Sequence, residues 1–151
     1  MSICLIDTSV FCNVLDVPGR NQQRPAVIQM LKDLANAKTV LLLPLAAILE
    51  TGNHIGQLAN GAGRRQSAGR FVVQVKAALE GKAPWIPTQF IESSDLQNWI
   101  DKFPDDAARG LGLGDLSIIQ EWERQRQLHP YKRVFIWAYD EHLAAYDTGA
   151  Q

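Results

Sequence analysis

The chain has 151 residues, of which 46% are hydrophobic and 21% charged, a composition typical of one globular domain. Its net charge of −1 excludes a strongly basic nucleic-acid-binding protein, so any surface for a polyanion has to be local. No apolar stretch is long enough to cross a membrane, and no signal peptide is expected because Asp7 interrupts the first apolar run. We therefore expect a single domain over residues 1–151 and a cytoplasmic location.

The first stretch of the chain predicts a buried strand with an acid at its end. Ile3–Ile6 is a short apolar run, and Asp7 follows it directly. Such a run is typical of strands in parallel sheets, which are covered on both faces. Because ligands of open α/β sheets bind at the carboxyl ends of the strands, Asp7 lies where chemistry is expected. A short helix is expected over Thr8–Leu15.

Predicted helices and strands alternate along the rest of the chain, which favours an α/β fold with a parallel sheet. Further strands are expected at Thr39–Leu43 and Arg133–Trp137, and Ala83–Phe90 fits either a short strand or an extended loop. Two glycine-rich stretches are expected to be irregular: Asn60–Arg65 as a flexible basic connection, and Asp105–Gly114 as a loop, at least at its end. Helices are expected over Arg24–Ala37, Leu45–Leu58, Gln66–Leu79, Ser94–Phe103 before Pro104, Asp115–Gln127 and Glu141–Tyr146.

Four acids are predicted to meet at one edge of this sheet. Asp7 ends the first strand, and Asp140 comes just past the last one. Asp115 opens a helix after a glycine-rich stretch, while Glu50 lies about two turns into the helix after the second strand. Neighbouring carboxylates raise one another's pKa unless a counter-charge is present. Oxygen ligands of this kind favour Mg²⁺ or Mn²⁺ over Zn²⁺.

Each acid also has a simpler interpretation. Asp7, Asp115 and Asp140 can cap helix N-termini, and Glu50 can be a solvated helix residue. The common edge of the sheet is what favours a shared site. The remaining loop and terminal aspartates are expected to be solvated: Asp16, Asp105, Asp106 and Asp147.

The four acids lie in the segments LIDTSVF, LAAILETGNHI, GLGDLSII and VFIWAYDEHL. In this order the segments resemble the PIN-domain nucleases, and especially the toxins of bacterial VapC-type toxin–antitoxin pairs. The resemblance covers nearly the whole chain, and its weight comes from the order and spacing of short motifs. It implies a three-layer α/β/α sandwich with a mainly parallel central sheet, and metal-dependent hydrolysis of RNA.

By this resemblance, the quartet that holds Mg²⁺ or Mn²⁺ and performs catalysis is Asp7, Glu50, Asp115 and Asp140. Ser9 matches the small polar residue near the first acid. The family also implies a small antitoxin protein as a partner and a homodimer. Two departures stand out: Ala138 replaces the Thr or Ser that often lies two positions before the last acid, and the segment between the second and third acids is long.

The most basic stretch of the chain supplies candidate substrate contacts. Arg64 and Arg65, followed by Arg70 and Lys76, can neutralise RNA phosphates, and a solvated helix face accounts for them equally well. His54 and His142 have the same two interpretations, as substrate contacts or as hydrogen-bonded structural residues. Cys4 and Cys12 are expected as reduced core thiols, without the CxxC spacing of a zinc site. Of the four tryptophans, Trp122 and Trp137 are expected in the core.

Two other functions compete with the nuclease. A phosphatase of the haloacid-dehalogenase kind needs a second acid two residues after the first, and Ser9 stands at that position. A non-catalytic PIN-like module that only binds RNA or a protein is the stronger alternative. Retention of all four acids argues against it, because buried carboxylates without partners are costly.

Overall fold

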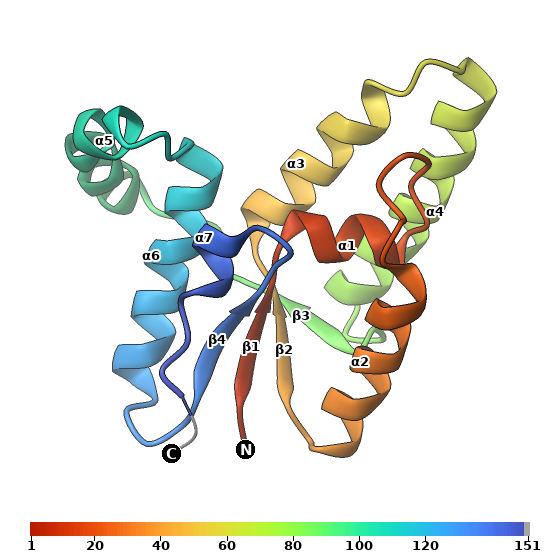
Figure 1. The fold of residues 1–151 in the computed structure, drawn as a ribbon. Coiled ribbons are helices and arrows are strands. Elements are labelled where there is room, and N and C mark those ends of the chain that lie inside the picture. The colour runs from red at the N-terminus through yellow and green to blue at the C-terminus, as the bar shows by residue number, and fades with distance from the viewer. Residues whose placement is uncertain (150–151) are drawn as a thin grey trace.

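A computed structural model of the chain describes residues 1–149, and its centre is a four-stranded parallel sheet (Figure 1). The strands are ordered β3-β2-β1-β4, and each pairs in parallel with its neighbours. The predicted α/β class and the parallel sheet are therefore confirmed. The strand bounds are β1 Ile3–Ile6, β2 Val40–Leu43, β3 Trp85–Pro87 and β4 Val134–Trp137.

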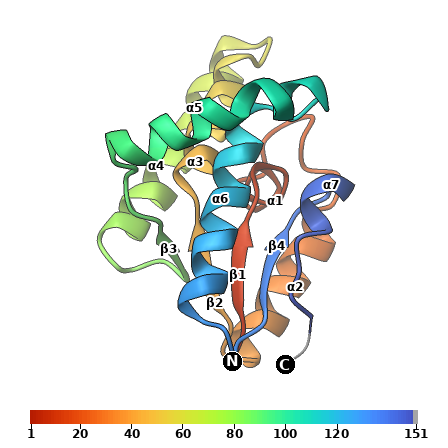
Figure 2. The same ribbon diagram turned by 90° about the vertical axis from the view of Figure 1, so that its left-hand side faces the viewer.

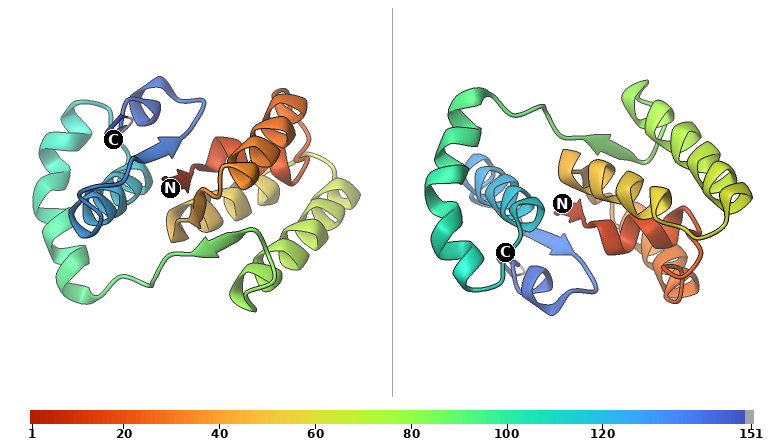
Figure 3. Two further views of the ribbon diagram at one scale, coloured as in Figure 1. Left: turned by 90° about the horizontal axis from the view of Figure 1, so that it is seen from below. Right: turned by 90° about the horizontal axis from the view of Figure 1, so that it is seen from above.

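Helices cover both faces of the sheet and complete a three-layer arrangement (Figures 2 and 3). Helices α1 to α4 pack on one face, whereas α6 and α7 pack on the other. Helix α5 packs against α6 and crosses it near the carboxyl ends of the strands. The helix bounds are α1 Thr8–Val14, α2 Arg24–Asn36, α3 Leu45–Gly56, α4 Gly61–Leu79, α5 Ser93–Ala108, α6 Leu113–Leu128 and α7 Glu141–Ala144.

The alternation of side chains along the central strand divides the hydrophobic core into two clusters. Cys4 and Ile6 of β1 belong to the cluster under α1 to α4. Ile3 and Leu5 belong to the cluster under α6 and α7. Because successive side chains of a strand point to opposite faces, an uninterrupted apolar run is what a strand covered on both sides requires. Cys4 is a free, buried thiol as predicted, and so is Cys12 on α1.

The segment Ala83–Phe90, for which the sequence allowed a strand or a loop, contains a short edge strand, β3. It pairs with β2 alone, with Leu41 opposite Trp85 and Leu43 opposite Pro87. Proline lacks an N–H for a second neighbour, so it suits an edge strand. The Trp85 side chain is buried and packs edge-on against Phe11, with 5.8 Å between the ring centroids.

The expected flexible connection over Asn60–Arg65 is wrong, because α4 begins at Gly61. The Asn60 side chain accepts a hydrogen bond from the Gly63 N–H at 3.0 Å, which caps the helix. The Arg64 guanidinium also donates to the Leu58 carbonyl at 2.5 Å. Each glycine costs a helix only about 1 kcal/mol, so a good cap and the packing of the rest of a long helix offset it.

Helix α5 also exceeds its predicted bounds, and the expected loop within Asp105–Gly114 is confined to residues 109–112, between α5 and α6. The helix begins at Ser93, where Glu92 and Asp95 form a reciprocal capping box, and it continues through Pro104 to Ala108. Pro104 is exposed, and so is Ile100, whose carbonyl loses its helical partner. Water can satisfy that carbonyl, so the proline does not end the helix.

Asp106 was expected to be solvated, and this is wrong as well. It is 8% exposed near the end of α5 and is paired with Arg109. The other predicted elements match in type, with small shifts at their ends; α7 stops at Ala144, before Tyr146. Among residues 1–149, no helix combines the length and the apolarity needed to span a bilayer.

Candidate active site

The four predicted acids come together at the carboxyl ends of the strands. Asp7 follows β1 and Asp140 comes after β4, which is the direct neighbour of β1 in the sheet. The Asp7 N–H donates to the Trp137 carbonyl at 3.0 Å, so the two strand ends remain side by side. Asp115 lies in the first turn of α6, and Glu50 lies on α3, which packs against α6. All four line one cavity of about 380 Å³, which we call the acid cavity.

Asp7 is buried, with 5% of its surface exposed, and it caps α1. Its carboxylate accepts hydrogen bonds from the Ser9 hydroxyl at 2.8 Å and from the Ser9 N–H at 3.3 Å. The Ser9 hydroxyl oxygen in turn accepts from the Tyr139 N–H at 3.1 Å. Ser9 therefore joins the first acid to the segment that carries Asp140, and it also lines the acid cavity.

The Glu50 side chain is positioned by a hydrogen bond from Thr8 and by the close packing of α6 against it. The Thr8 hydroxyl donates to Glu50 Oε2 at 3.0 Å. A Cβ atom built on Gly114 would overlap Glu50 Oε1. A side chain at this position would require the Glu50 carboxylate to move. Gly114 thus permits the present position of this carboxylate, and it lies in α6 rather than in the expected loop.

Asp115 carries the clearest electrostatic sign that the acids share one environment. Desolvation by burial, followed by the negative charges of Asp7, Glu50 and Asp140, raises the pKa of Asp115 to about 6. The nearby His142 opposes this rise. Mutual repulsion of this kind is expected where carboxylates converge without a counter-charge.

Asp140 is exposed and is the most open of the four acids. It caps the short helix α7 and accepts a hydrogen bond from the His142 N–H at 2.8 Å. His142 itself is exposed, and its side chain lines a second cavity that also contains Asp115 and Asp140. Asp140 is therefore positioned by the backbone at the start of α7.

The donor set matches a hard divalent cation in chemistry, since four carboxylates surround one cavity. Their present arrangement is not a closed ligand shell. Within residues 1–149, no three His, Cys, Asp or Glu side chains are grouped closely enough to hold a metal ion. Three of the acids instead accept hydrogen bonds from Ser9, Thr8 and the His142 N–H. In each case the hydrogen bonds engage only one carboxylate oxygen, so the acids can keep these partners, and metal binding requires the side chains to move closer together.

The sequence interpretation missed Arg20, which lines the acid cavity from the loop between α1 and α2. Within residues 1–149, its guanidinium forms neither an ion pair nor a hydrogen bond. Its loop is nonetheless well anchored: Val17 is fully buried, and the Asn13 side chain accepts from the Gln23 N–H at 2.9 Å. The sequence offered only a turn composition here, which carries no information about where a side chain points.

His54 also lines the acid cavity, one helical turn after Glu50. Its Nδ1 atom is buried without a hydrogen-bond partner in the described part of the chain. Burial, together with the positive charge of Arg20, lowers the pKa of His54. A neutral imidazole at the wall of the cavity is the state that this environment favours.

The other predicted basic contacts lie elsewhere. Arg64 is engaged with the Leu58 carbonyl, and Arg65 lines a separate cavity between the end of α1 and α4. Arg70 donates to the Leu15 carbonyl at 2.9 Å and so has a structural partner. None of the three lines the acid cavity. Their role in RNA binding stays a prediction, without a place beside the acids.

Comparisons of the chain with protein-family models, with curated proteins and with solved structures gave no match. The PIN-like resemblance therefore rests on the four motifs in the sequence. What the protein does has to be argued from the acid cavity and the elements around it.

Proposed function

We propose that the protein is a Mg²⁺- or Mn²⁺-dependent endoribonuclease of the PIN-like type. The observation that carries the proposal is the acid cavity, where carboxylates from four separate elements converge. Burial, together with the other three acids, raises the pKa of Asp115 there. Carboxylates brought together in this way cost stability unless they serve a cation. The order of the four motifs gives the same assignment independently.

Each acid has a role in this proposal. Asp7 and Asp115 are the principal ligands, and the open Asp140 completes the site. Glu50 binds through a water molecule or orients the attacking water. When bound, the metal ion lowers the pKa of a coordinated water and stabilises charge on the phosphate and the leaving oxygen. Thr8 and Ser9 hold Glu50 and Asp7 in place beforehand.

The partners proposed are an RNA substrate, a small antitoxin protein and a second copy of the chain, in the cytoplasm. A patch of exposed apolar side chains supports a homodimer. It surrounds a largely apolar cavity of about 250 Å³ lined by Leu49, Ile91, Leu96, Trp99 and Leu113. Sedimentation as a monomer at micromolar concentration would remove the dimer from the proposal. A small overlapping reading frame beside the gene would support the antitoxin.

The alternative is a non-catalytic PIN-like module that binds RNA or a protein. One observation favours it: three of the four carboxylates already have hydrogen-bond partners in the protein. Such a module binds its partner without metal and leaves RNA intact, so a cleavage assay separates the two functions.

The test is cleavage of a labelled single-stranded RNA by purified protein, with Mg²⁺ or Mn²⁺ and with a chelator. We expect cleavage that stops on chelation and falls about a hundredfold or more in Asp7→Asn, the scale of losing one preorganised electrostatic group. Asp33→Asn is the matched control, because Asp33 is an exposed residue of α2. Equal residual activity in wild type and Asp7→Asn would identify a contaminant and contradict the proposal.

A further inference from the structure

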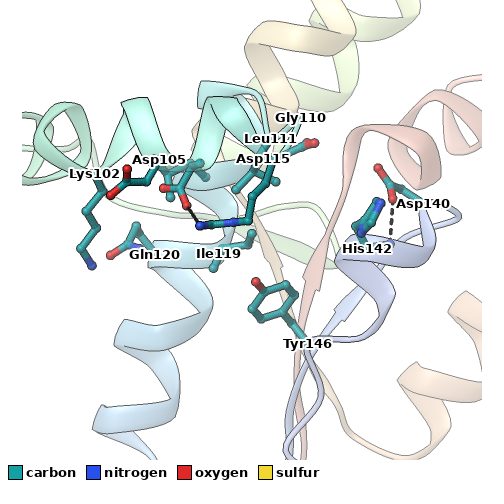
Figure 4. Close-up of a pocket in the computed structure, with 13 residues that line it drawn as sticks. Lys102, Asp105, Gly110, Leu111, Asp115, Ile119, Gln120, Asp140, His142 and Tyr146 are labelled. Carbon is teal, nitrogen blue, oxygen red and sulfur yellow. Dashed lines mark hydrogen bonds and ion pairs between the residues drawn. The ribbon is translucent and has the colours of Figure 1, made fainter.

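The acid cavity opens beside a second, larger cavity on the other side of Asp115 and Asp140. This second cavity has a volume of about 610 Å³ and lies between α5, α6 and α7 (Figure 4). Asp115 and Asp140 line both cavities. We call the second one the α5 cavity. The two cavities therefore adjoin at these acids, at the carboxyl ends of the strands, and we call them together the trough.

Cationic side chains lie at both ends of this trough, with the acids between them. Arg20 lines the acid cavity at one end. Lys102 and Arg109, both on or beside α5, line the α5 cavity at the other. Asp105 and Asp106 line the α5 cavity as well. Asp106 is paired with Arg109, which leaves Lys102 as the cation there for a phosphate. A chain of phosphates that crosses the acids can then meet Arg20 on one side and Lys102 on the other.

Among the residues that the structure describes, Arg20 and Lys102 have no partner that a ligand would have to displace. Within residues 1–149, neither Arg20 nor Lys102 takes part in an ion pair or a side-chain hydrogen bond, and both are exposed. Arg109 differs, because it is paired with the buried Asp106. The shared feature here is that both cations line the same trough as the four acids.

The loop that carries Arg20 is anchored firmly enough to present it. The Arg20 N–H donates to the Val17 carbonyl at 2.9 Å, and Val17 is fully buried. Asn13 accepts from the Gln23 N–H and donates to the Ser9 carbonyl at 2.8 Å, which links this loop to the residue that holds Asp7. The backbone of the loop that carries Arg20 is thus tied to the first acid through Asn13 and Ser9.

We propose that the trough binds a single-stranded phosphodiester chain, with Arg20 on a phosphate to one side of the cleaved linkage and Lys102 on a phosphate to the other. The proposal rests on the proposed function, since the acids then act on the linkage between these two phosphates. Arg20 and Lys102 are positioning residues, and Arg109 supports the wall of the α5 cavity through Asp106.

The experiment measures binding by fluorescence anisotropy of a labelled single-stranded oligonucleotide, in the Asp7→Asn background with Mg²⁺ so that the strand stays intact. Arg20→Gln and Lys102→Gln should each weaken binding about fivefold at 0.1 M salt and lower the salt-dependence slope by about 0.7, the value for one phosphate contact in a single strand. The double variant should show the product of the two factors, because each cation contacts its own phosphate.

Two matched controls lie outside the trough. Lys38→Gln replaces an exposed lysine between α2 and β2, and Lys32→Gln replaces an exposed lysine of α2. Both should bind as the background does. If either control weakens binding as much as the trough variants, the contribution is general surface charge and the proposal is overturned. Unchanged binding in Arg20→Gln or Lys102→Gln overturns it as well.

Different results contradict the proposed nuclease activity and the proposed binding in the trough. RNA cleavage that needs Asp7 but ignores both cations would contradict the trough and leave the nuclease standing. No binding and no cleavage would contradict both. Parallel titrations with single-stranded RNA and single-stranded DNA report whether the shared phosphodiester chemistry or the ribose decides affinity. An unchanged thermal unfolding temperature in each variant confirms that the substitutions of exposed residues leave the fold intact.

Discussion

Burial and the arrangement of the acids raise the pKa of Asp115, and this makes the free energy of unfolding depend on pH. The pKa of this residue is raised from 3.8 to about 6, first by burial and then by the other three acids. The folded chain therefore binds this proton more tightly than the unfolded chain does. As pH rises between these two values, the unfolded chain loses the proton first, so the free energy of unfolding falls.

We predict that metal-free protein loses stability across this pH window and that Asp115→Asn does not. The loss should be ~1 kcal/mol, well below the full effect of the shift, because solvent screens a half-exposed group. Urea unfolding in the presence of a chelator, repeated from about pH 4 to about pH 7, measures it. An identical fall in Asp115→Asn would mean that other groups cause the pH dependence.

For individual residues, the sequence predicted where the four acids lie but not which cations lie near them. Asp7 and Asp140 follow strands, and Asp115 opens a helix, so their common edge follows from the parallel topology. Arg20 sits in a loop whose course depends on the contacts of Asn13 and Val17, which no local pattern encodes. Arg64 and Arg65 stood out only because they are adjacent in the sequence.

Helices α3 and α6 approach each other through Gly114, and this contact positions Glu50. An alanine Cβ there would overlap the carboxylate, which is the mobile end of its side chain. The strain can be relieved by moving that carboxylate, and alanine also favours the helix by about 1 kcal/mol. Stability and site geometry should therefore respond differently to the same substitution.

Gly114→Ala is predicted to unfold within a few degrees of wild type while losing about tenfold or more of its RNA cleavage, as found when a group that orients a ligand is lost. Thermal unfolding and the cleavage assay measure the two effects. Gly69→Ala is the matched control, because Gly69 is also helical and its Cβ meets no atom within 4 Å. A fully active Gly114→Ala protein would show that Glu50 need not occupy its present position.

The elements that the sequence predicted least well are those in which tertiary contacts outweigh local preference. Helix α4 begins among glycines because Asn60 caps it, and α5 passes through Pro104 because the affected turn faces water. The buried strands, by contrast, were recognised from continuous apolar runs. A strand with helices on both faces requires such a run, so the pattern alone indicates a buried strand.

For the whole molecule, two hydrophobic clusters bury both faces of the sheet and leave the carboxyl ends of its strands for the acids. Helices α1 and α6 begin at this edge, so the positive ends of their dipoles face the carboxylates of Asp7 and Asp115. These partial charges offset some of the repulsion, and a bound cation would offset the rest. The central claim is that the four acids act as one cation site.

Calorimetric titration with Mn²⁺ tests that claim most directly, with wild type, Asp7→Asn, Asp115→Asn and the Asp33→Asn control measured side by side. We predict binding that weakens as pH falls through about 6, where Asp115 regains its proton, and that drops about tenfold or more in both acid-cavity variants but not in the control. Mn²⁺ binding that is absent from wild type, or equal in all four proteins, would contradict the claim.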